Sequence, residues 1–355
     1  MKRLAPALLM LLAASASAPP VAQEIDPLLD SFLGLGNELT NGTGSGEADA
    51  LEISRDIFGR SDEAYGAFQR GYYLTAMALA LPRAENADPA AQTLIAEIYA
   101  NGLGVALNVA TASSWYSLAA RNGDRVAAFK LGLLYLSGSG VPENRTRAAE
   151  LFKQAADRDY APAQYNLALL HVEGQYAAPS LAEAARLMKA AADAGLAEAQ
   201  YDYGTMLLEG AGVPPDKAEG ARQIALAAEQ GLIEAQIDYA TLLYMGEGVD
   251  RDLAAAVGWY ERAANAGNPV AQNRYAKLLA VGEGVPLSLK QAAMWRSLAR
   301  RQGLSDPSLD RLLVAIPRTE LAEAEELARF WPSRPPLAAD AGGLETDPVE
   351  APTGT

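Results

Sequence analysis

The apolar positions of residues 232–267 follow two successive helical patterns. In the first stretch, 234–244, apolar residues take the i, i+4, i+7, i+8 spacing of one helix face: Ala235, Tyr239, Leu242 and Leu243. The second stretch, 255–266, repeats this kind of spacing. The pattern therefore predicts a hairpin of two helices in this segment.

The residues between and after these stretches indicate where the two helices begin and end. Gly246 and Gly248 interrupt the first helical pattern, and Asp252 stands where it can cap the second helix. Gly267 follows the second pattern, at the place where glycine commonly ends a helix. We expect a tight loop between the two helices.

This hairpin pattern recurs every 36 residues. Three sets of small residues share the period: an alanine set, a glycine set and a second alanine set, namely Ala91, Ala127, Ala163, Ala199, Ala235 and Ala271; Gly102, Gly138, Gly174, Gly210, Gly246 and Gly282; and Ala119, Ala155, Ala191, Ala227, Ala263 and Ala299. A hairpin of this size cannot bury its apolar face alone, so we expect consecutive hairpins to stack.

The repeated unit resembles the Sel1-like repeat, a relative of the tetratricopeptide repeat. The resemblance lies in an Ala-Gln pair that opens the first helix, a Gly-x-Gly-Val loop, and an aromatic-rich second helix with an Ala-Ala pair: Ala235-Gln236, Gly246-Glu247-Gly248-Val249, and Trp259-Tyr260 to Ala263-Ala264. Six units cover 87–303. The resemblance implies an all-α fold, a right-handed superhelical solenoid of stacked antiparallel helix hairpins.

The third unit departs from the loop pattern. Its loop reads Gly174-Gln175-Tyr176-Ala177, without the second glycine and the valine. Because Tyr176 cannot adopt a positive φ as easily as glycine, this loop should have a different conformation. Two interpretations remain open, drift of the repeat and a local binding feature.

Weaker helical patterns flank the six units. Residues 62–86 predict a degenerate opening hairpin, with helices over 64–70 and 72–81. Residues 304–331 predict a helical cap, with helices over 307–315 and 319–331 and with Trp331 folded back on the last repeat. Terminal caps of this kind cover the ends of a repeat array.

The N-terminus has the layout of a secretory signal peptide. Lys2 and Arg3 precede a short apolar run, and small residues follow, which predicts a signal peptide over 1–18 with cleavage near 16–22. We expect an exported protein, in the periplasm, with the extracellular medium as the alternative.

Three further segments lie outside the repeats and their caps. Residues 23–61 read as a flexible N-terminal segment with a Gly-rich linker at 41–47, and 25–39 within it is an apolar stretch. That stretch either docks on the array or serves a partner or a membrane. The Pro-rich and acidic tail 332–355 should be disordered.

The composition excludes several functions. The chain has 29 basic and 44 acidic residues and a formal net charge of −15, so phosphate backbones and anionic membranes should repel it. It has no cysteine, which excludes thiol catalysis, thiolate metal sites and disulfides. Its one histidine, His171, falls at a packing position of the repeat. We expect no catalytic residue, no metal site and no cofactor, and hence no enzyme.

Function should then lie on a surface. The first helices of stacked hairpins line the concave face, and rotation by about 100° per residue gives the positions that point away from the buried side. The candidate partner-binding residues at these positions are Phe129, Lys130, Leu133, Tyr165, Asn166, Leu169, Tyr201, Asp202, Thr205, Ile237, Asp238, Tyr244 and Arg274. They form either an aromatic and apolar groove for a basic peptide or partner helix, or packing between neighbouring first helices.

The resemblance implies a non-catalytic scaffold, adaptor or regulator in the bacterial periplasm. Its partner would be a protein or a peptide, such as the periplasmic domain of a membrane sensor. Two alternatives are a hydrolase of the Sel1-like β-lactamase type, disfavoured because such proteins have a cysteine pair per repeat, and a secreted factor directed at a host.

Overall fold

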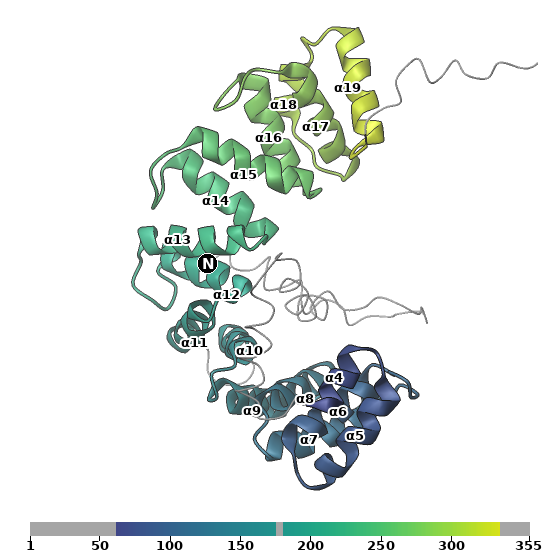
Figure 1. Cartoon of the computed structure of the whole chain (residues 1–355). Helices are drawn as coiled ribbons and strands as arrows, with labels where there is room; N and C mark the ends of the chain where they lie inside the picture. The colour runs from purple at the N-terminus through teal and green to yellow at the C-terminus, as the bar shows by residue number, and fades with distance from the viewer. Residues whose placement is uncertain (1–61, 175–179, 334–355) are drawn as a thin grey trace, which may run out of the picture. The chain divides into compact units, whose positions relative to one another are not determined.

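The computed structural model describes residues 62–174 and 180–333. Within these ranges it contains 16 α-helices and no strand. Figure 1 labels these helices α4 to α19. The predicted signal peptide, the segment 25–39, the linker 41–47, the departing loop of the third unit after Gly174 and nearly all of the tail lie outside the described residues. The chain divides into two compact units, Met1–Ala190 and Ala191–Thr355.

The first unit consists of antiparallel hairpins in chain order. Its helices are α4 (Glu63–Gln69), α5 (Tyr73–Glu85), α6 (Pro89–Ala100), α7 (Val109–Arg121), α8 (Arg125–Ser137), α9 (Arg145–Ala156), α10 (Ala161–Glu173) and α11 (Leu181–Asp193), whose last residues belong to the second unit. Each helix from α4 to α9 packs against the next one along the chain.

The second unit continues the same arrangement and ends in two further helices. It contains α12 (Ala197–Glu209), α13 (Lys217–Glu229), α14 (Ile233–Met245), α15 (Leu253–Asn265), α16 (Pro269–Val281), α17 (Leu289–Arg301), α18 (Pro307–Leu313) and α19 (Arg318–Phe330). Helix α19 packs against α17, and α18 contacts both α16 and α17. The expected all-α fold of stacked helix hairpins is confirmed.

The alanine sets mark the places where helices meet closely. Every member of the two alanine sets has an exposed fraction of 0–2%. Larger side chains fill the spaces between the contacts, for example Ile95 in α6, Phe152 in α9 and Leu279 in α16, each of which is fully buried. Small residues at the contact allow two helix backbones to approach, so the periodic alanines determine the hairpin geometry.

The second glycine of the Gly-x-Gly loop lies against the preceding repeat. At Gly248, φ is +70° and an added Cβ would lie 2.0 Å from the backbone oxygen of Lys217, at the start of α13. At Gly284, a Cβ would lie 2.7 Å from the oxygen of Leu253, at the start of α15. Glycine is therefore required by contact as well as by backbone conformation.

The glutamine of the Ala-Gln pair joins each hairpin to the one before it. In five repeats its buried side-chain amide donates to the carbonyl eight residues earlier, at 2.8–3.5 Å: Gln92 to Ala84, Gln164 to Ala156, Gln200 to Ala192, Gln236 to Ala228 and Gln272 to Ala264. In three of these repeats the glutamine oxygen also accepts a bond from the end of its own second helix, from Asn122, Gln230 or Gln302.

The second repeat lacks this glutamine and replaces its bond from another helix. Ala128 stands at the glutamine position, and the carbonyl that it leaves is that of Ala120. Gln154, in α9, donates to that carbonyl at 2.6 Å. Leucine occupies the equivalent of position 154 in three other repeats, at Leu118, Leu226 and Leu298. The bond between consecutive hairpins is thus kept by a different residue.

Two of the predicted helix boundaries at the ends are wrong in detail. Helix α5 does not end at residue 81 but continues through Pro82 to Glu85. Proline there removes the bond to the carbonyl of Ala78, on the exposed side, while Ala80 and Ala84 remain buried on the other side. Helix α18 ends at Leu313, two residues earlier than predicted.

The expected contact of Trp331 with the last repeat is present. Its ring lies 6.1 Å from the ring of Trp295 in α17, with the two planes at 66°. Pro317 directly precedes α19. Helices α18 and α19 therefore cover the last repeat hairpin.

Candidate interaction surface

The first helices of the hairpins carry the predicted partner-binding residues, and six of these residues belong to the first unit. Phe129 is only 7% exposed, because its ring packs on those of Phe152 and Tyr160 at 5.6 and 5.3 Å between centroids. Lys130 forms an ion pair with Glu97 on α6, at 3.7 Å. Leu133, Leu169, Tyr165 and Asn166 are half-buried, and the Asn166 amide donates to its own helix.

The other seven predicted residues belong to the second unit, where several of them join neighbouring first helices. The Tyr201 hydroxyl on α12 donates to Asp238 on α14 at 2.9 Å. Burial and the adjacent Asp238 carboxylate raise the pKa of Tyr201 above its ordinary value. Thr205, half-buried, donates back to the carbonyl of Tyr201 at 3.0 Å. The bond between Tyr201 and Asp238 joins α12 to α14.

A second group of contacts joins α14 to α16. Arg274 donates to the Thr241 hydroxyl at 2.5 Å, and the same hydroxyl lies 2.8 Å from that of Tyr260. One turn further along α14, the Tyr244 hydroxyl donates to Glu283 at 2.8 Å, and this hydrogen bond raises the pKa of Tyr244. The polar side chains of this face therefore stabilise the stacking of the repeats.

The predicted outward orientation is wrong for three of the residues. Phe129, Asp202 and Ile237 are each 7% exposed. The angle about a helix axis does not show which side chains cover a residue: the Phe129 ring packs on Phe152 of its own hairpin partner α9 and on Tyr160 directly before α10. Ile237 accordingly belongs to the apolar core around Tyr275 and Leu278. The partner-binding role of the whole set stays a prediction.

The structure exposes other residues of the same helices that rotation did not select. Met245 and Val281 occupy the same repeat position at the ends of α14 and α16, with 64% and 52% exposure, and Val270 at the start of α16 is 40% exposed. Glu209, on α12, is exposed at the position equivalent to Met245. Comparison along the repeat gives the signal: earlier units have polar residues here, and the last two have apolar ones.

Residues on one side of α12, α14 and α16 form three rows, one on each helix, which we call the first-helix surface of the second unit. Residues four, seven and eleven apart lie on one side of a helix, and they give one row on each of α12, α14 and α16: Glu198, Asp202, Thr205 and Glu209; Glu234, Asp238, Thr241 and Met245; Val270, Arg274, Lys277 and Val281. The first two rows are acidic, and the third is basic and apolar.

A further polar cluster lies where the α16 row meets the cap. Asp306 caps α18 and accepts hydrogen bonds from the side chains of Asn273 and Lys277, both at 2.6 Å. Burial alone would raise the pKa of Asp306, but the bonds from Lys277, Ser308 and Asn273 hold it well below the ordinary value. This cluster ties the cap to the last repeat.

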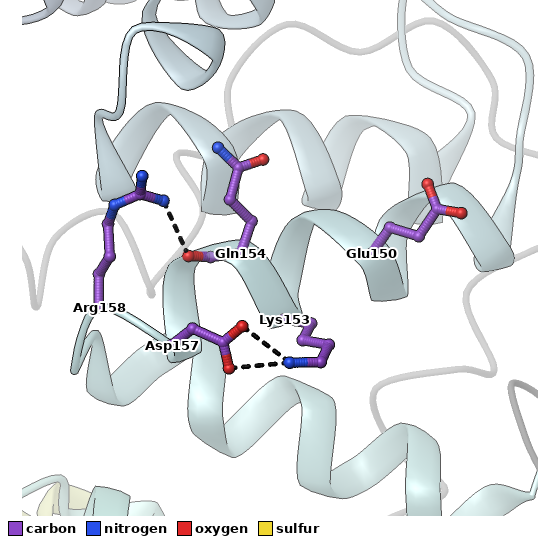
Figure 2. Close-up of a pocket in the computed structure, with 5 residues that line it drawn as sticks. All are labelled: Glu150, Lys153, Gln154, Asp157 and Arg158. Carbon is purple, nitrogen blue, oxygen red and sulfur yellow. Dashed lines mark hydrogen bonds and ion pairs between the residues drawn. The ribbon is translucent and has the colours of Figure 1, made fainter.

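Two depressions in the described surface are open to solvent and lined by charged residues. One follows α9, where Lys153 pairs with Asp157 at 2.7 Å and Arg158 donates to the backbone of Gln154, as Figure 2 shows. Another lies between α17 and α19 and is lined by arginines and glutamates.

The described residues include no group of three or more side chains that could bind a metal ion together. The one histidine, His171, is half-buried near the end of α10. No described helix is both long and apolar enough to cross a lipid bilayer.

Stacked hairpins with a 36-residue period, held together by an alanine contact and a buried glutamine, define a helical-repeat protein. The Sel1 repeat matches six consecutive segments, 89–124, 125–160, 161–196, 197–232, 233–268 and 269–304. The chain belongs to the Sel1 repeat family. Sel1 repeats generally mediate protein–protein interaction. No curated protein matches the sequence.

Two solved structures are similar to this chain over most of its length. One is c5321 of uropathogenic Escherichia coli, described as a protective antigen with an SLR fold; it is 26% identical, with a TM-score of 0.63, and the match covers 71% of this chain and 56% of that one. The other is a Sel1 repeat protein from Oxalobacter formigenes, 29% identical, with a TM-score of 0.59, covering 70% of this chain and 100% of that one.

Proposed function

We propose that this protein is a non-catalytic, exported scaffold that binds a peptide or a partner helix on the first-helix surface of its second unit. The observation that carries the proposal is the exposed pair Met245 and Val281. Apart from these two and the less exposed Val270, the row positions of α12, α14 and α16 are polar. An apolar pair at one repeat position is what a partner can desolvate.

The charges of this surface indicate the chemistry of the partner. Glu198, Glu209 and Glu234 remain accessible on the α12 and α14 rows, although Asp202 is buried and Asp238 is engaged by Tyr201. A segment with basic residues at one end and apolar residues at the other is complementary to these rows. Complementary charge favours the encounter and the orientation, and the apolar contact supplies the affinity.

The experiment uses a photo-crosslinking amino acid at Met245 in cells that export the full chain. The matched control is Arg222, whose side chain is 58% exposed on α13, a second helix. We expect discrete protein adducts from position 245 that are absent from position 222. Identical adduct patterns at the two positions would refute the surface assignment.

A pair of substitutions tests the apolar contact in the same cells. Met245→Asp with Val281→Asp should abolish the adducts of a crosslinker at Glu234, because a charge replaces apolar contact area. Both side chains are exposed, so the helical circular dichroism and the melting temperature should stay near those of the unaltered chain. Retention of the adducts would contradict the proposed contact.

The location in the periplasm is part of the proposal and has its own test. It is supported by the three-part sequence of residues 1–18. N-terminal sequencing of the chain from a periplasmic fraction should begin between residues 17 and 23. A chain that keeps Met1 in the cytoplasm would overturn this part.

One observation supports the secreted alternative. The similar c5321 is described as a protective antigen of uropathogenic E. coli. If this chain is likewise presented to a host, it should appear in the culture medium and bind a host protein through the first-helix surface. A β-lactamase activity is disfavoured by the absence of cysteine, and hydrolysis of a chromogenic β-lactam by the purified chain tests it.

A further inference from the structure

Helix α5 has an outer face that is apolar to an unusual degree. Its arc away from α6 carries Leu74, Leu79 and Leu81, with 62%, 38% and 39% exposure, and Tyr72 directly before the helix is 61% exposed. Ala78 and Pro82 lie between them and are also exposed. A helix that is apolar around its whole circumference is normally covered.

The repeats themselves show that this face departs from the pattern. Helix α5 occupies residues 73–85, which is 36 residues before α7. At the positions of Leu74, Ala78 and Leu81, α9 has Thr146, Glu150 and Lys153, and α13 has Ala218, Arg222 and Ala225. The second helices of the array therefore present small or charged residues to water, and α5 alone presents two leucines at these positions among the described helices.

The first helix of this hairpin is also short. Helix α4 has 7 residues, whereas the first helices of the six repeats have 12 or 13. It buries only Ala64 and Ala67. In the repeats, a full-length first helix covers side chains that the short α4 leaves exposed on α5. For example, Leu151, which is equivalent to Leu79, is only 2% exposed.

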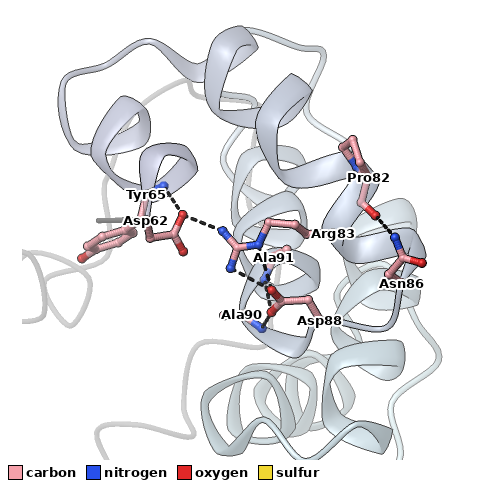
Figure 3. A network of polar contacts seen from close by, with 8 residues as sticks. All are labelled: Asp62, Tyr65, Pro82, Arg83, Asn86, Asp88, Ala90 and Ala91. Atoms are coloured by element: carbon pink, nitrogen blue, oxygen red, sulfur yellow. Dashed lines mark hydrogen bonds and ion pairs between the residues drawn. The ribbon is translucent and has the colours of Figure 1, made fainter. Parts of the chain in front are cut away.

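The chain that precedes α4 is anchored directly on α5. Asp62 accepts a hydrogen bond from Arg83 of α5 at 2.8 Å and caps α4 through Tyr65, and Arg83 also bonds Asp88 (Figure 3). Any segment before residue 62 is therefore tethered beside this face.

We propose that residues 25–39 of the same chain dock on the outer face of α5. This segment carries apolar residues at the i, i+3, i+4, i+7, i+8 spacing that suits one side of a helix: Ile25, Leu28, Leu29, Phe32 and Leu33. The docked segment covers the first hairpin as α18 and α19 cover the last one. It is the cap that the N-terminal end of a repeat array requires.

The tether favours this occupant over a second copy of the chain. Residues 40–61 separate the segment from Asp62. A random-coil linker of the same 22-residue length would have a root-mean-square span of about 26 Å. Helix α5, with 13 residues, is about 20 Å long. Such a tether gives an effective concentration on the order of a millimolar, far above that of a second molecule in solution.

The chain contains no cysteine, so disulfide crosslinking tests the docking directly. The test pair is Leu33→Cys with Ala78→Cys in the full exported chain. The matched control is Leu33→Cys with Glu150→Cys, because Glu150 holds the position of Ala78 in the second repeat and is also exposed. We expect an intramolecular disulfide to form roughly tenfold faster in the test pair than in the control.

Two results would overturn the proposal. The first is an equal rate in the two pairs. The second is a disulfide-linked dimer of the single variant Ala78→Cys whose yield rises with protein concentration, which would assign the face to a second copy.

Because a cysteine pair can perturb its surroundings, Phe32→Asp in the otherwise unaltered chain gives an independent measurement. Amide hydrogen exchange of α5 should become faster in this variant, and an unchanged rate would count against docking.

Discussion

In the second repeat, Gln154 of α9 makes the hydrogen bond that the glutamine of the Ala-Gln pair makes in the other repeats. This exchange of donors offers a quantitative test of how the hairpins are joined. Gln154 supplies the bond to Ala120 that Ala128 cannot, at 2.6 Å. We predict that Gln154→Leu lowers the free energy of unfolding, because the carbonyl loses this side-chain donor. Leucine is the residue that three other repeats have at this position, and its helix propensity is close to that of glutamine.

The magnitude follows from the contact. One neutral hydrogen bond contributes about 1 kcal/mol, and the Ala120 carbonyl keeps its backbone bond from Gly123, so the loss should not exceed about 1.5 kcal/mol. Ala128→Gln in the same chain restores the arrangement of the other repeats. In that background Gln154→Leu should have almost no effect, which gives a coupling energy of about 1 kcal/mol between the two positions.

The assay is equilibrium unfolding in urea, followed by circular dichroism at 222 nm, for the unaltered chain, both single variants and the double variant. The denaturant slope should be the same in all four, so that midpoints report stability alone. Because packing changes at position 154 cancel in the cycle, the coupling isolates the hydrogen bond. An equal effect of Gln154→Leu in both backgrounds would show that the reasoning is wrong.

Three further outcomes follow from the described contacts, each measured by unfolding. Gly248→Ala should lower the free energy of unfolding by about 2–4 kcal/mol, because its Cβ would lie 2.0 Å from a backbone oxygen. The control Gly231→Ala has open space around the new Cβ and a φ of +96°, so it should lower the free energy of unfolding by only about 1 kcal/mol. The depressed pKa of Asp306 stabilises the fold above its unfolded pKa, near 3.8, and this contribution disappears as the pH falls through the folded pKa. Asp306→Asn, which keeps a capping residue, should therefore be destabilising at pH 7 and nearly neutral in strong acid; a difference independent of pH would refute this. Trp331→Ala should cost about 1–3 kcal/mol through lost contact with Trp295, and an unchanged midpoint would show that the ring does not stabilise the cap.

Sequence reasoning reached the hairpins because the repeat supplies its own comparison. Six copies of one pattern average out the local exceptions, so the helix pairs, the capping Asp252 and the terminal helices could all be placed. Pro82 shows the limit at an unrepeated end: the helix predicted to end at residue 81 continues through the proline, because buried alanines hold the opposite side of α5.

The interaction surface was less accessible to such reasoning. The angle of a residue about its own helix axis does not show which neighbouring side chains cover it, which is why the exposure of Phe129, Asp202 and Ile237 was mispredicted. The cluster of Asp306 with Asn273 and Lys277 joins the repeat to a cap with a different sequence pattern, so no internal comparison could reveal it.

The position of the unusual hydrogen bond also bears on how an array of this kind can change its length. Gln154 and Ala128 both lie within the segment 125–160, so the exceptional residue and its replacement are inherited together. If that whole segment is duplicated or lost, every carbonyl of this kind keeps a side-chain donor. A crossover between positions 128 and 154 separates the two residues and leaves one carbonyl without its donor. Recombination within such a gene is therefore tolerated best at the boundaries between hairpins, and the number of repeats can vary without redesign of the contacts between them.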